Sequence, residues 1–114
     1  MMRTEDVALY RALDAKARAE RPCALATVVA TRGSTPRKVG AKMLVDPDEG
    51  LVGTVGGGCG EGEVLEAADE VLRTGIPQMV RIDLTKDFLS WDPAVCGGTM
   101  DVFVEAIRTR AEDG

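Results

Sequence analysis

Two cysteines stand among glycines in this sequence, and a thiol in such a setting is a candidate ligand or nucleophile. Cys59 lies within Leu51–Gly62, which reads LVGTVGGGCGEG, and Cys96 begins the run Cys-Gly-Gly-Thr. A helix is predicted to begin at Glu61, where backbone N–H groups and the helix dipole would lower a thiol pKa and attract an anion. A tight turn around an inert, buried cysteine fits the same residues, and the local sequence leaves both interpretations open.

A second candidate site is the loop at residues 31–40, TRGSTPRKVG, which concentrates positive charge. Residues 24–45 contain no acid, although the whole chain carries a formal net charge of -5. Arg37 and Lys42, together with the hydroxyl of Ser34, supply donors suited to a phosphate. The alternative is a solvated basic loop that pairs with surface carboxylates.

The amino-acid composition of the chain argues against several classes of function. A chain of 114 residues is long enough for one domain with a core, and its net charge of -5 argues against a general binder of nucleic acid or anionic membranes. The absence of histidine and of C-x-x-C disfavours a zinc site and excludes Ser-His or Cys-His hydrolase chemistry within one protomer. We therefore assign no catalytic residue and no metal ligand. No signal peptide or membrane span is recognisable, so a cytoplasmic location is expected.

The periodicity of apolar residues predicts the elements that position these groups. One helix is expected to begin at Thr4, with Leu9, Leu13 and Ala17 along one face, and a second at Glu61. Short apolar or alternating runs predict strands at residues 23–30, 41–46, 51–55, 79–85 and 100–107.

The strands at 41–46 and 51–55 are expected to form a hairpin, because four turn-forming residues separate them. Such a hairpin brings Gly40 and Gly56 close together, which places the basic loop within reach of Cys59.

The strand at 79–85 is expected to run parallel to the strand at 51–55 through a helical crossover. Cys23, in a continuous apolar run, is predicted to be a core residue. The pattern as a whole predicts an α/β fold, a single domain with a mixed sheet of about five strands flanked by helices.

Three segments together resemble the N-terminal domain of the XdhC/CoxI family. They are ALATVVATRGSTPRKVGAKMLV, LVGTVGGGCGEGEVLEAADEVL and VCGGTMDVFVEAI, and they cover most of residues 24–107. Members of this family resemble maturation factors for xanthine dehydrogenase or carbon monoxide dehydrogenase. The resemblance implies binding of molybdenum cofactor, support for its sulfuration and transfer to the apo-molybdoenzyme. It also implies that residues 1–114 form one such domain, with no Rossmann domain, into which many members continue.

The resemblance implies that Cys59, in a Gly-Gly-Cys motif, contacts the cofactor. The cofactor is molybdopterin with a phosphate or in a dinucleotide form, and the implied contacts are Cys59, Gly57, Gly58, Arg37, Lys42, Ser34, Glu61 and Cys96. Many members read Gly-Gly-Cys-Val-Glu where this chain has Gly60 after the cysteine, so an altered turn is expected.

The implied partners are the apo-molybdoenzyme, a sulfur donor such as a cysteine desulfurase, a separate Rossmann-domain subunit, or a second copy in a homodimer. The alternative function is a non-catalytic interaction module that docks a separate Rossmann subunit or the target enzyme. An enzyme with Cys59 as nucleophile is disfavoured, because the chain has no histidine to serve as its base.

Overall fold

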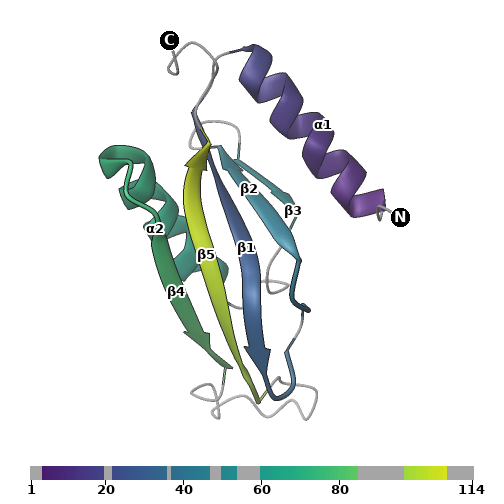
Figure 1. Ribbon diagram of the computed structural model, residues 1–114, viewed down its shortest axis with the longest axis vertical. Coiled ribbons are helices and arrows are strands. Elements are labelled where there is room, and N and C mark those ends of the chain that lie inside the picture. The colour runs from purple at the N-terminus through teal and green to yellow at the C-terminus, as the bar shows by residue number, and fades with distance from the viewer. Residues whose placement is uncertain are drawn as a thin grey trace.

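The elements predicted from the sequence appear in the same order in the structure, a computed structural model that describes residues 4–19, 22–35, 37–46, 50–53, 60–84 and 97–107. In chain order they are α1 (Thr4–Arg18), β1 (Cys23–Arg32), β2 (Lys42–Asp46), β3 (Gly50–Gly53), α2 (Glu61–Thr74), β4 (Gln78–Asp83) and β5 (Thr99–Ile107) (Figure 1). The hairpin of β2 and β3 is confirmed, with Met43 opposite Gly53, whereas Gly56 lies outside the described residues.

The sheet has five strands in the order β3-β2-β1-β5-β4. This confirms the predicted α/β domain with about five strands flanked by helices. The expected mixed sheet is wrong, because all four pairings of the described strands are antiparallel. β3 and β4 do run in the same direction, but α2 carries the chain from one edge of the sheet to the other. Strands of like direction are therefore never neighbours.

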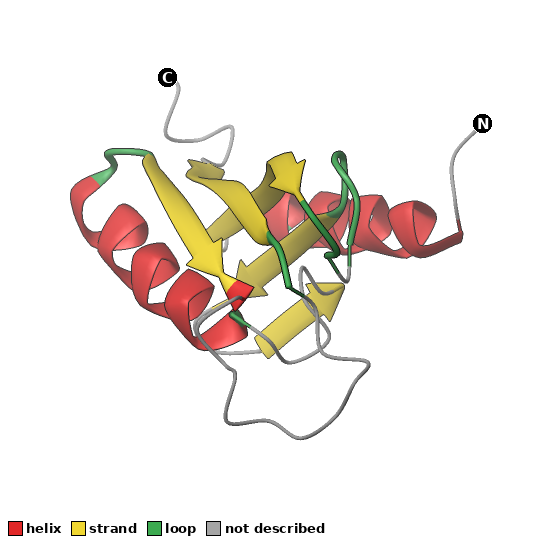
Figure 2. Ribbon diagram, turned by 90° about the horizontal axis from the view of Figure 1, so that it is seen from below, coloured by secondary structure: helices red, strands yellow, loops and turns green. Residues whose placement is uncertain are grey.

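One face of the sheet packs against α2, which contacts β5, β1 and β4. Alternate strand residues point to this face, as the pleat requires. Figure 2 shows α2 on one side of the sheet and α1 on the other. The core on this side is closed by small and branched side chains of the helix, namely Val64, Ala67, Ala68 and Val71.

The other face is covered by α1 over β2 and β3. Leu9 is buried there with Cys23 and Leu44, as predicted for Leu9. Ala17, however, is exposed, and Lys16 is buried in the face where an apolar residue was expected. Lys16 lies seven positions after Leu9, two helical turns further along the same face, and its ammonium is drawn inward by a carboxylate of β2. The Lys16 Nζ lies 2.9 Å from the Asp46 Oδ2.

Cys23 is a core residue with 1% of its surface exposed, as predicted. Burial raises the pKa of its thiol, the negative charge of Asp46 raises it further, and the positive charge of Lys16 opposes both. The thiol therefore stays protonated at neutral pH and lacks the thiolate character that nucleophilic or metal-binding cysteines need.

No helix in the described part of the chain is long and apolar enough to cross a membrane.

Candidate functional site

Three strand termini meet at one end of the sheet, the lower end in Figure 1. Thr99, the first residue of β5, lies opposite Arg32 at the end of β1 and opposite Asp83 at the end of β4. The amino terminus of α2 lies at the same end, because Gly60 approaches Ile82 of β4. We call residues 32–35, 60–61 and 97–98 the glycine-lined end.

The basic loop and the Cys-Gly-Gly segment touch through their backbones. A Cβ added at Gly98 would overlap the carbonyl oxygen of Arg32 and would lie 2.8 Å from the carbonyl oxygen of Ser34. Reciprocally, a Cβ at Gly33 would lie 3.0 Å from the Cα of Gly98. The N–H of Leu84 donates to the carbonyl oxygen of Gly98 at 2.9 Å, which fixes the segment from the β4 side. Only glycine at position 98 permits this approach.

Gly60 makes the turn into α2. Its φ of 78° is left-handed, and it stands at the N-cap position without any side-chain cap. A Cβ here would lie 2.6 Å from the Cγ2 of Ile82. A valine, as in the common family motif, would be both strained and overpacked in this conformation. The first N–H groups of α2 consequently have no side-chain acceptor at the cap position.

Ser34 and Arg37 lie on the return from β1 to β2, and Lys42 is the first residue of β2. Ser34 is exposed at the contact with Gly98, and Arg37 is partly buried, with its carbonyl oxygen accepting from the Thr35 hydroxyl at 2.9 Å. Lys42 donates to the carbonyl oxygen of Gly40 at 3.1 Å.

Lys42 does not reach the contact between Ser34 and Gly98. It pairs with Thr27, several residues before the end of β1. At about 3.3 Å per strand residue, its backbone lies on the order of 15 Å back along the sheet from Arg32. The structure thus brings together Ser34 and Gly98, and sets Lys42 apart from them.

Glu61 is the first residue of α2 and is partly buried. A carboxylate in the first turn is favoured by the helix dipole, so the position of Glu61 alone does not indicate a functional role. The remaining predicted contacts, Cys59, Gly57, Gly58 and Cys96, lie outside the described residues. In the chain, Cys59 directly precedes Gly60 and Cys96 directly precedes Gly97. Within the described ranges no three Cys, Asp or Glu side chains gather as a metal site would require.

A guanidinium and a carboxylate hold β4 to β5 beside this end. Arg81 donates to Asp101 through two nitrogens, Nε at 2.8 Å and a terminal nitrogen at 3.3 Å. The hydrogen bond from Arg81 lowers the pKa of Asp101, partial desolvation opposes it, and the positive charges of Arg81 and Arg32 add to the lowering. Arg32 ends β1 opposite Thr99, two residues before Asp101 on β5.

The pairing predicts a low titration midpoint for Asp101, below the ordinary value of 3.8. Because the folded pKa is lowered, the stabilisation by the pair is fully present above about pH 4 and is lost as pH falls through the folded value. We expect carboxyl ¹³C shifts of Asp101 to report this midpoint, and Arg81→Gln to move it back toward 3.8. An Asp101 midpoint unchanged by Arg81→Gln would contradict the assignment.

Sequence reasoning missed the structural role of Gly33 and Gly98. Both lie close in the sequence to predicted site residues. Gly33 directly precedes Ser34, and Gly98 lies two positions after Cys96. A glycine beside a candidate ligand is a sign of close backbone approach. The sequence therefore indicated a close approach at these glycines, but it did not indicate which segment of the chain approaches them.

Comparison with known proteins identifies relatives of this arrangement. The model of the XdhC and CoxI family matches residues 16–83. The chain is 39% identical to the uncharacterized protein YqeB of Escherichia coli over 83 residues, 73% of this chain and 15% of that protein. It is 36% identical to a probable xanthine dehydrogenase subunit of Bacillus subtilis over 100 residues, 83% of this chain and 29% of that protein.

A crystal structure described as a xanthine dehydrogenase from Bacillus halodurans has the same fold. It superposes with a TM-score of 0.74 at 33% identity and covers 90% of this chain and 31% of the other. The chain therefore spans less than a third of each of these three relatives.

Proposed function

Because the chain belongs to the XdhC and CoxI family, we propose that it binds molybdenum cofactor at the glycine-lined end and delivers it to a molybdoenzyme. The recipient would be of the xanthine dehydrogenase or carbon monoxide dehydrogenase type, and the chain would act as a maturation chaperone. The names of the two xanthine dehydrogenase relatives support the class of recipient.

The observation that carries the proposal is the backbone contact of Gly98 with the basic loop, at the end of the sheet where α2 begins. Gly98 brings the segment that follows Cys96 against Ser34, and Gly60 turns the segment that follows Cys59 into α2. Gly60 and Gly97, which directly follow Cys59 and Cys96 in the sequence, thus lie at the same end of the sheet. The side-chain positions of both Gly98 and Gly60 are already filled, at Gly98 by the carbonyl oxygen of Arg32 and at Gly60 by Ile82, so these two glycines hold chain segments together at this end.

The residues present fit the chemistry of this cofactor. Its phosphate or pyrophosphate suits the uncapped N–H groups of α2, the hydroxyl of Ser34 and the guanidinium of Arg37. Its sulfur and metal suit the thiols of Cys59 and Cys96, since soft ligands prefer one another. When bound, the cofactor supplies the metal centre that the recipient enzyme requires. Glu61 could hold the pterin N–H donors, because a carboxylate accepts such bonds.

Lys42 keeps a role only through its long side chain, since its backbone is set back from the glycine-lined end. The same proposal accommodates two further partners, a sulfur donor such as a cysteine desulfurase and a separate Rossmann-domain subunit.

The proposal is tested by variants co-expressed with molybdopterin biosynthesis. We expect Cys59→Ser to lose most of the retained pterin, and Arg37→Ala to weaken retention roughly tenfold, the scale of one charge-assisted bond. Arg73→Ala, in the last turn of α2 at the opposite end of the helix, is the matched control and should retain as much as the unaltered chain. Oxidation of the purified proteins and pterin fluorescence measure retention, and melting temperature confirms folding.

Equal retention by Cys59→Ser and the unaltered chain would overturn the assigned role of Cys59. Stable binding of a Rossmann subunit with no pterin in any variant would instead favour the interaction module.

A further inference from the structure

β4 forms one edge of the sheet. Within the described residues it pairs with β5 alone, whereas β3 at the opposite edge is contacted by α1. An edge strand carries backbone N–H and C=O groups on its outer side that can pair with another strand. Two apolar side chains near this edge are exposed, Ile76 by 66% and Met79 by 59%. β4 is therefore the place on the described sheet where a further strand could be added.

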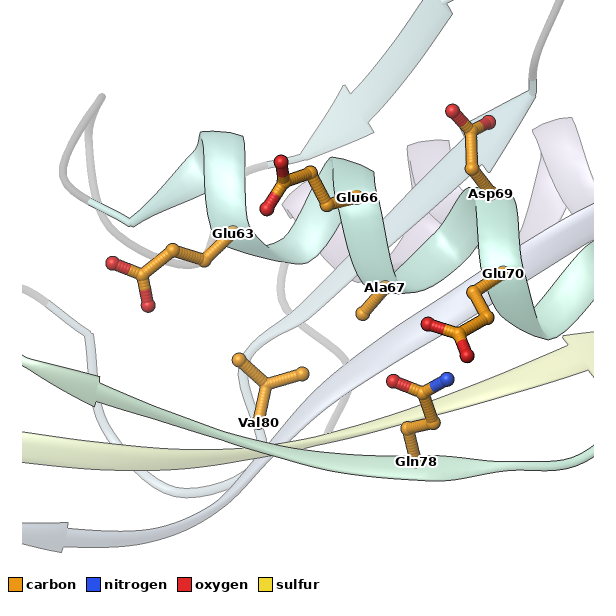
Figure 3. A pocket seen from close by; sticks show the side chains of 7 residues that line it. All are labelled: Glu63, Glu66, Ala67, Asp69, Glu70, Gln78 and Val80. Atoms are coloured by element: carbon orange, nitrogen blue, oxygen red, sulfur yellow. The ribbon is translucent and has the colours of Figure 1, made fainter.

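A row of carboxylates on α2 lies above this edge. Figure 3 shows Glu63 and Glu70 projecting from the helix toward the side of β4, with Gln78 rising toward Glu70, whereas the carboxylates of Glu66 and Asp69 do not point toward β4. Together with β4 these residues of α2 enclose an open hollow of about 500 Å³, whose lining is Glu63, Glu66, Ala67, Asp69, Glu70, Gln78 and Val80. We call Glu63, Glu66, Asp69 and Glu70 the acidic row.

The acidic row costs the folded chain free energy. Glu66 stands three positions from Glu63 and from Asp69 and four from Glu70, and like charges at these spacings destabilise a helix by about 0.2–0.5 kcal/mol per pair. The helix dipole compensates Glu63 in the first turn but not the later residues. None of the four forms an ion pair with any residue in the described part of the chain. Ion pairs within the described part of the chain therefore do not explain the row.

The negative charge of the acidic row determines which kind of strand can pair with β4. A second copy paired through β4 would bring its own acidic row against this one, and such like-charge contact across an interface is strongly unfavourable. A strand with Lys or Arg at alternate positions would instead direct its cations into the hollow, because alternate side chains of a strand point to one face. Its backbone would meanwhile pair with β4.

We propose that β4 and the acidic row form a docking site for a basic extended segment of a partner protein, which adds a sixth strand to the sheet. This site lies along the edge of the sheet, and the proposal does not depend on cofactor binding at the glycine-lined end.

The test uses the full chain and three fluorescent peptides of equal length. The first alternates Lys and Val, the second alternates Glu and Val, and the third is the Lys-Val peptide N-methylated at every residue, so that its charge stays but its backbone N–H donors are lost. Anisotropy measures affinity, and amide hydrogen exchange locates binding. Glu66→Lys is compared with Asp14→Lys, an equal charge reversal at an exposed position of α1.

We expect the Lys-Val peptide to bind and to protect amides of β4. The Glu-Val and N-methylated peptides should bind at least about tenfold more weakly, and Glu66→Lys should weaken Lys-Val binding by a similar factor while Asp14→Lys does not. Equal binding of the N-methylated peptide, unprotected β4 amides, or no binding of the Lys-Val peptide would overturn the proposal. A dimer in sedimentation that protects β4 without peptide would also overturn it, in favour of a second copy.

Discussion

Gly98→Ala is expected to lower the free energy of unfolding by about 3 kcal/mol, at the upper end of the cost of overpacking. The added methyl would overlap the carbonyl oxygen of Arg32 and approach that of Ser34, and both obstacles are backbone atoms. Backbone cannot rotate aside as a side chain can, so the start of β5 or the basic loop must move. The melting temperature should fall by roughly 10 °C in a domain of this size, as calorimetry would measure.

Gly97→Ala is the matched control, one position away. A Cβ at Gly97 meets nothing within 4 Å, so its melting temperature should change little. If Gly98→Ala also keeps the wild-type melting temperature, the assigned contact of Gly98 with the backbone of Arg32 and Ser34 is wrong. If the proposed function holds, Gly98→Ala should in addition lose pterin at temperatures where it is still folded.

Breaking the buried ion pair between α1 and β2 is the second change with a large expected effect. Lys16 and Asp46 side chains are 8% and 1% exposed, with 2.9 Å between charged atoms. Lys16→Met leaves the carboxylate of Asp46 without its ammonium partner, and removing one member of a buried pair costs about 3–5 kcal/mol. Urea unfolding should show a lower midpoint with an unchanged slope.

Two comparisons make this result specific. Lys16→Met combined with Asp46→Leu should recover most of the loss, because apolar residues often replace a buried pair without cost. Arg18→Gln removes the exposed pair with Asp14 on the same helix, where the side chains are 81% and 64% exposed, and should cost at most about 0.5 kcal/mol. Equal, small effects of Lys16→Met and Arg18→Gln would contradict the burial of the pair.

The helices and the hairpin could be predicted because their determinants are local. The apolar period after Glu61 and the glycine at position 75 defined α2, and turn residues between two apolar runs defined the pairing of β2 with β3. The error at Ala17 arises because the determinant is not local. Periodicity assigns apolar residues to the buried face, and it cannot foresee that Asp46, from a distant strand, draws Lys16 inward.

The order of the strands could not be predicted from local pattern. β5 inserts between β1 and β4, a choice fixed by which faces match across the whole sheet. The same limit applies to the candidate site. The sequence marked Ser34 and the glycines beside Cys96 separately, and only the pairing of Arg32 with Thr99 brings them together. Lys42 lies away from the glycine-lined end because it pairs with Thr27, and no local motif encodes this register.

The central claim, that this chain binds molybdenum cofactor, is tested most directly by the pterin content of the unaltered protein. The chain would be purified from two host strains, one able and one unable to make molybdopterin, and its oxidised pterin would be measured by fluorescence and mass spectrometry. We predict a near-stoichiometric pterin from the first host and none from the second. Folded protein from the first host without pterin, and without binding when isolated molybdopterin is added, would contradict the account.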